Sequence, residues 1–288
     1  MQRRVLADGT AGRRLQLSRS RRLRLQHLRE LRKLHPRLLA RGVPLVGSEQ
    51  LAQSMALLFK DCLENRGNKR RVLRAAEIAH QLYDQGELAA PSARPLGCKP
   101  GCDRCCYAFV SLLAPEALLL AERLKQQNEK LDRPSIKEFR ANANSLRGLN
   151  QGARASGKRL ACPILEEHLC SLHADRPISC RKHTSFSVEA CVAALRGEDV
   201  PIPAHVDYHT LGTTVSVTFR AALKSLGYSL ALYELSEAVS TVVDTEDALR
   251  RWTDGEDILA GVQRDTTTPT HLSAVIASLA RAISTPPK

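Results

Sequence analysis

Seven cysteines lie between positions 98 and 180 of this 288-residue chain, and most of them are closely spaced. The chain has nine cysteines in all, and an odd count argues against complete disulfide pairing. Disulfide scaffolds are typical of short secreted chains, whereas this chain is long and has no apolar stretch after its N-terminal arginines. In an intracellular protein such clustering indicates metal or redox chemistry. We therefore expect a cytoplasmic protein with a metal site.

The first cluster reads C-K-P-G-C-D-R-C-C and supplies Cys98, Cys102, Cys105 and Cys106. Its Pro-Gly pair favours a turn, which lets the thiols converge on one point. Thiolates held that close repel each other unless a cation neutralises them, and a bound metal ion does so while deprotonating them. The spacing therefore predicts that all four are metal ligands.

The second cluster supplies the remaining ligands, Cys162, Cys170 and Cys180. His173 and His183 each follow a cysteine after two intervening residues, a spacing with which one turn can chelate a tetrahedral ion. Cys191 follows on what the pattern predicts to be a short helix. The two histidines and Cys191 are therefore further, weaker candidate ligands.

The apolar residues outside the clusters recur at helical spacing. Four of them would lie on one face of a helix that begins near residue 46. The same spacing predicts a second helix over residues 69–85, and we expect Gly86 and Pro91 to end it. A helix that begins near Pro115 and a polar one over about 134–150 would bring residue 160 back beside residue 106. Apolar residues at helical spacing also predict a last helix. No stretch shows the sustained alternation of apolar and polar residues that is typical of a strand. The fold class is therefore mainly α, a helical domain with a loop-rich cysteine cluster. The predicted buried positions are Leu51, Met55, Leu58 and Cys62 in the first helix and Leu272, Val275, Ile276, Leu279 and Ile283 in the last.

The net charge of +13 is concentrated at one end of the chain. Residues 1–42 hold thirteen basic residues against two acidic ones. We expect residues 1–45 to form a basic, disordered tail, and binding of nucleic acid is expected only through this tail. Residues 46–288 are predicted to form a single helical domain with the metal site at 98–191. No apolar run is long enough to predict a membrane span.

These residues resemble the YkgJ-type cysteine-cluster family, abbreviated CxxCxxCC and described as a zinc- or iron-chelating domain. The resemblance covers Cys98 to Cys106, Cys162-Pro163, Cys170 and the stretch from Arg176-Pro177 to Cys180-Arg181, and longer bacterial members are similar from His183 to Cys191. This chain has three residues between Cys98 and Cys102 where the signature has two. Members are variously labelled iron-sulfur oxidoreductases or zinc-binding proteins, so the resemblance implies a metal site but no settled reaction.

Two classes of function follow. The protein could hold an iron-sulfur cluster and act as an oxidoreductase or electron carrier with an unidentified protein partner, and the surplus of thiols over the needs of one zinc ion favours this class. Alternatively, it is a zinc- or iron-chelating module in which the metal is structural or stored. The C-x3-C-x2-C spacing of Cys98, Cys102 and Cys105 also occurs in radical-SAM methylases, but these place it in a β/α barrel. Gly152–Lys158 only approximates a phosphate-binding loop, and we attribute it to chance.

Overall fold

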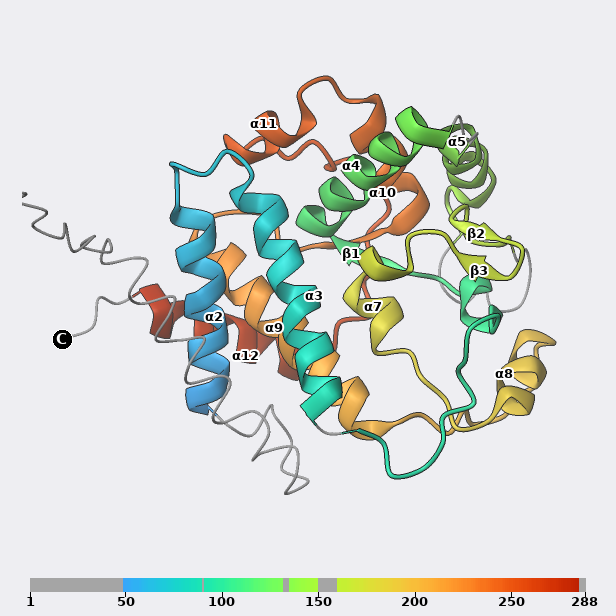
Figure 1. Cartoon of the computed structure of the whole chain (residues 1–288). Helices are drawn as coiled ribbons and strands as arrows, with labels where there is room; N and C mark the ends of the chain where they lie inside the picture. The colour runs from blue at the N-terminus through green and yellow to red at the C-terminus, as the bar shows by residue number, and fades with distance from the viewer. Residues whose placement is uncertain (1–48, 90, 132–134, 150–159, 285–288) are drawn as a thin grey trace, which may run out of the picture.

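The computed structural model describes residues 49–89, 91–131, 135–149 and 160–284, and it is mainly α (Figure 1). The predicted fold class is confirmed. The α-helices are α2 (Glu49–Glu64), α3 (Arg71–Ala89), α4 (Ala114–Leu131), α5 (Ser135–Leu146), α7 (Ile178–Arg181), α8 (Val188–Leu195), α9 (Val206–Ser225), α10 (Leu235–Asp244), α11 (Ala248–Thr253) and α12 (Thr270–Ser284). The short elements are the 3-10 helices η2 (Arg104–Tyr107) and η3 (His173–Asp175) and the strands β1 (Ser111–Leu113), β2 (Leu165–Glu166), β3 (Leu169–Cys170) and β4 (Leu232–Glu234).

Helices α2, α3, α9 and α12 pack together around one hydrophobic core (Figure 1). Phe59 of α2 stacks on Phe219 of α9, with ring centroids 4.5 Å apart. The predicted buried face of α2 is confirmed, because none of its four residues is more than 1% exposed. Cys62 belongs to this face and is therefore a core residue.

A second group of helices, α4, α5 and α10, packs against the first through α4 and α3 and is accompanied by a short antiparallel sheet. In this sheet Leu112 of β1 pairs with Tyr233 of β4, and each strand leads directly into a helix. A carboxylate stabilises each of these strand-to-helix junctions: Glu116 accepts a hydrogen bond from Leu113 N at 2.9 Å, and Glu234 accepts one from Glu237 N at 2.7 Å. The junctions fix where α4 and α10 begin.

One predicted boundary is wrong. Gly86 does not end its helix, because α3 continues to Ala89 and buries Gly86 within it. A glycine inside a helix costs only about 1 kcal/mol relative to alanine, and the packing of α3 against α4, α7 and α9 outweighs that cost.

The prediction that the chain brings residue 160 back beside residue 106 is confirmed, because Cys162 N donates a 2.8 Å hydrogen bond to Cys106 O.

The two sheets found in the described ranges have two strands each, so this part of the chain does not form a β/α barrel. None of its helices is long and apolar enough to span a membrane. The basic tail and the stretch Gly152–Lys158 lie outside the described residues, and the division into tail and single domain stays a prediction.

Candidate metal centre

The second cysteine segment, residues 170–181, is tied to helix α3 by the guanidinium of Arg181. This side chain is only 4% exposed. It donates from Nε to Arg176 O at 2.8 Å, from one Nη to Ala174 O, and from the other Nη to the carboxylate of Asp84 on α3. The hydroxyl of Tyr83 donates in turn to Arg181 O at 2.8 Å. Cys180 is therefore held by hydrogen bonds that involve no metal.

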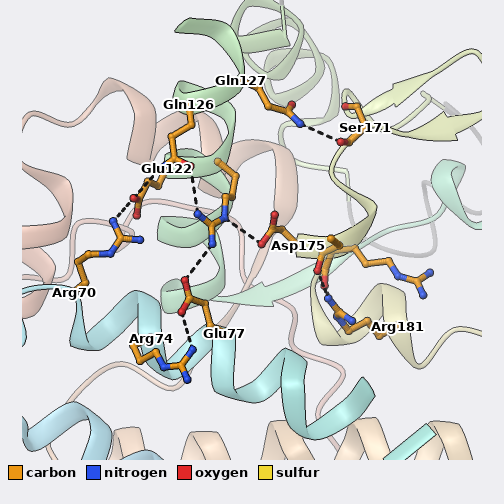
Figure 2. Close-up of polar contacts among 12 residues, drawn as sticks. Arg70, Arg74, Glu77, Glu122, Gln126, Gln127, Ser171, Asp175 and Arg181 are labelled. Atoms are coloured by element: carbon orange, nitrogen blue, oxygen red, sulfur yellow. Dashed lines mark hydrogen bonds and ion pairs between the residues drawn. The ribbon is translucent and has the colours of Figure 1, made fainter. Parts of the chain in front are cut away.

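Helix α4 fixes the same segment through a second set of polar contacts (Figure 2). Arg123 donates to Asp175 at 3.2 Å and to Glu77 of α3 at 3.1 Å. Gln127 donates to Ser171 O at 3.0 Å. Two helices thus form a rigid platform under the loop that carries Cys170 and Cys180.

The first cysteine segment, residues 98–106, follows a long connection that leaves the helical bundle after α3 (Figure 1). Its predicted turn is confirmed, since Cys102 N donates to Lys99 O at 2.9 Å and Gly101 has a φ of +84°, a conformation that favours glycine. Cys105 and Cys106 then lie in η2, which buries no residue. This segment is shaped by local turns and carries little buried apolar surface.

Five thiols lie close enough for their charges to interact, and we call them the thiol group: Cys105, Cys106, Cys162, Cys170 and Cys180. Burial is the main reason why the pKa of Cys162 rises to about 12, and the neighbouring thiol of Cys170 raises it further. Burial also raises the pKa of Cys180 well above its ordinary value, with Cys162, Cys105 and Cys170 adding to the effect. The segments thus bring cysteines from both clusters to one place, as predicted.

Backbone amides point at three of the sulfurs. Ile164 N donates to the sulfur of Cys162 and Leu172 N to that of Cys170, each two residues further along the chain. Ser185 N donates to Cys98 Sγ at 3.3 Å. Such hydrogen bonds favour the charged thiolate, which is the form that binds metal.

The guanidinium of Arg176 acts on several members of the thiol group. Arg176 lowers the pKa of Cys105, Cys170 and Cys180 through its charge. Its Nε is buried and has no hydrogen-bond partner among the described residues. The donor set, the amides and this cation together fit a metal or cluster that requires several thiolates.

All nine cysteines are free, and within the described ranges no three Cys, His, Asp or Glu side chains meet at the spacing of a metal-ion site. The sulfurs are therefore neighbours that have not converged. Metal binding commonly supplies the free energy for that last step, because thiolates without a cation repel each other.

The other predicted ligands lie around this group or apart from it. Cys98 is exposed, and its charge neighbours are Cys102, Cys105 and Cys191. Cys191 is on α8, the short helix that was predicted. His173 is exposed beside Arg176 and Arg181, and His183 lines a separate cavity. Their roles as ligands stay predictions.

The sequence reasoning missed one contact beside the centre. Asp103, only 1% exposed, lies 2.7 Å from Nδ1 of His168 through its Oδ2. His168 is in the β2–β3 hairpin, where Glu167 and His168 have φ values of 46° and 66°. Carboxylate–histidine pairs are common around metal ligands. Only the two-residue gap between the strands could have signalled the hairpin, and no pattern links two residues so far apart.

Comparison with protein families gives one finding. Residues 97–196 match the model of the family described as "CxxCxxCC: Putative zinc- or iron-chelating domain". Comparisons with curated proteins and with solved structures give no significant match. The matched range includes every cysteine of both clusters and excludes the core residue Cys62. Residues 97–196, which hold both cysteine clusters, are therefore similar to the CxxCxxCC zinc- or iron-chelating domain.

Proposed function

We propose that this domain holds an iron-sulfur cluster and serves in electron transfer with a protein partner in the cytoplasm. The observation that carries the proposal is the composition of the thiol group, in which five cysteines interact with one another. All-thiolate sets are the usual ligands of iron-sulfur clusters. Such a cluster supplies reversible one-electron transfer when bound.

The surrounding residues support a site of high negative charge. Four thiolates carry more charge than one zinc or iron cation neutralises, and Arg176 together with the amides of Ile164 and Leu172 offsets part of it. Hydrogen bonds to sulfur are also a main means of setting the reduction potential of a cluster. These residues would therefore determine both whether the site assembles and its potential.

The test is the identity of the metal, measured on full-length protein purified without oxygen. We expect a brown protein that contains iron and acid-labile sulfide together and bleaches with dithionite, because iron-sulfur clusters absorb visible light and zinc does not. Stoichiometric zinc without sulfide would overturn the electron-transfer proposal and leave a structural or storage metal. Iron without sulfide would also overturn it, since this indicates a mononuclear thiolate site.

A further inference from the structure

Helices α7 and α9 and the stretch before α12 line an open cavity of about 340 Å³, with polar and apolar walls, that the proposed function does not use. Pockets that bind small molecules begin at about this volume. Ser179 and Lys182 line the cavity from α7 and the residue after it, and they flank Cys180 in the sequence. The wall that carries Cys180 is thus shared between the thiol group and the cavity.

The carboxylates of the cavity are already engaged by the protein itself. Glu116 accepts one hydrogen bond from Ile178 N at 2.8 Å and another from Leu113 N at 2.9 Å. Asp265 accepts from the amide of Thr267 at 2.8 Å and from its hydroxyl at 2.5 Å. Each carboxylate therefore uses two of its acceptor positions on hydrogen bonds to the walls.

The cations of the cavity are less well satisfied. Arg220 is 8% exposed and donates to Leu230 O at 2.9 Å and to Thr268 at 3.3 Å. Lys182 has neither a hydrogen-bond acceptor nor a carboxylate within ion-pair distance in the part of the chain that the structure describes, although the charges of Asp265 and Glu116 act on it. An ammonium group that is partly buried in this way lacks a partner that a ligand could supply.

The side chain of Lys182 packs directly against Gly212 of α9. A Cβ atom on Gly212 of α9 would lie 2.5 Å from the Cβ of Lys182, closer than atoms can approach. Any larger residue at position 212 would therefore push the side chain of Lys182 away from α9. Beyond this point α9 lines the cavity with Thr213, whose hydroxyl donates to His209 O at 2.9 Å, and with Ser216.

We propose that this cavity binds a small organic oxyanion, with the carboxylate or phosphate of the ligand against Lys182 and its polar remainder against the hydroxyl-bearing walls. Charge-assisted hydrogen bonds from lysine are a usual means of holding such groups, and the hydroxyl of Ser216 can donate a further hydrogen bond to them. The proposal does not depend on which metal the thiol group holds. It adds a ligand site whose wall is the helix of Cys180.

Isothermal titration of the full-length protein with glycerol 3-phosphate and with succinate tests this site and distinguishes phosphate from carboxylate. We expect one of the two to bind and Lys182→Met to weaken it by about tenfold or more, since a charge-assisted hydrogen bond is lost. Lys125→Met, a change of an exposed lysine on α4, is the matched control and should bind as the unmodified protein does.

A second variant separates ligand binding from folding or metal content. Ser216→Leu leaves every charge in place and fills part of the cavity, so it should also abolish binding while circular dichroism and metal stoichiometry stay unchanged. If neither compound binds the unmodified protein, or if binding survives both Lys182→Met and Ser216→Leu, the proposal is wrong. A colourless zinc-containing protein that still binds the anion would overturn only the electron-transfer proposal.

Discussion

The two cysteine segments reach the same centre by different means. Residues 170–181 are held by a buried arginine, by ion pairs to α3 and α4, and by buried apolar residues such as Leu172 and Ile178. Residues 98–106 have local turns, and η2 buries nothing. The difference leads us to expect that, without metal, the second segment is the better-ordered half of the centre.

The largest expected effect is the loss of metal when either half loses a ligand. Cys105→Ser in the first segment and Cys180→Ser in the second should each weaken metal binding by at least about tenfold, because both belong to the thiol group. Elemental analysis of the purified variants measures this.

Cys62→Ser is the matched control for these variants. Its sulfur donates to Arg71 O at 3.5 Å, a contact that a serine hydroxyl can make, and its metal content should not change. Equal metal content in all three variants would contradict a shared centre.

Arg181→Met should destabilise the second segment most. The change leaves two carbonyls without their donor and removes the partner of Asp84, which is itself half exposed, so we expect a loss of about 3 kcal/mol in the free energy of unfolding. Urea unfolding of the metal-free protein measures it. Arg250→Met removes an exposed ion pair instead and should cost under about 0.5 kcal/mol. Similar losses in both variants would contradict the platform.

Removing the metal should affect the two segments unequally. In hydrogen exchange the amides of Cys102 and Cys106 should exchange about tenfold faster or more in the metal-free protein, because only local turns protect them. The amide of Lys182, which donates to Ile178 O, should change much less. Equal acceleration at these positions would show that both segments depend on the metal.

His168→Ala tests the one side-chain contact that ties Asp103 of the first segment to the hairpin. The ring is 71% exposed, so we expect a modest loss of about 1 kcal/mol in the free energy of unfolding and faster exchange in residues 98–106. His271→Ala, a change of an exposed histidine on α12, provides the comparison. Unchanged exchange after His168→Ala would show that the contact does not hold the segment.

The smallest expected effect is that of deleting residues 1–45. The tail contains none of the predicted ligands, so metal stoichiometry and helical content should stay as they are in the full chain. Metal analysis and circular dichroism measure both, and a truncated protein without metal would contradict the predicted division of the chain.

The sequence by itself determined the helices and the metal-binding chemistry of this protein. Helical periodicity fixed the buried face of α2, and cysteine spacing fixed the candidate ligands, because both depend on residues that are close in the chain. It failed at Gly86, where tertiary packing outweighs the local preference of glycine.

Only the tertiary structure decided how the two segments are anchored and what surrounds them. Arg181 meets Asp84 across 97 residues, Asp103 meets His168 across 65, and Lys182 lies against Gly212 of another helix. Contacts between residues so distant in the chain arise from helix packing, which no local pattern encodes. Candidate ligands could therefore be proposed from the sequence, whereas the anchoring of residues 170–181, the position of Arg176 and the neighbouring cavity could not.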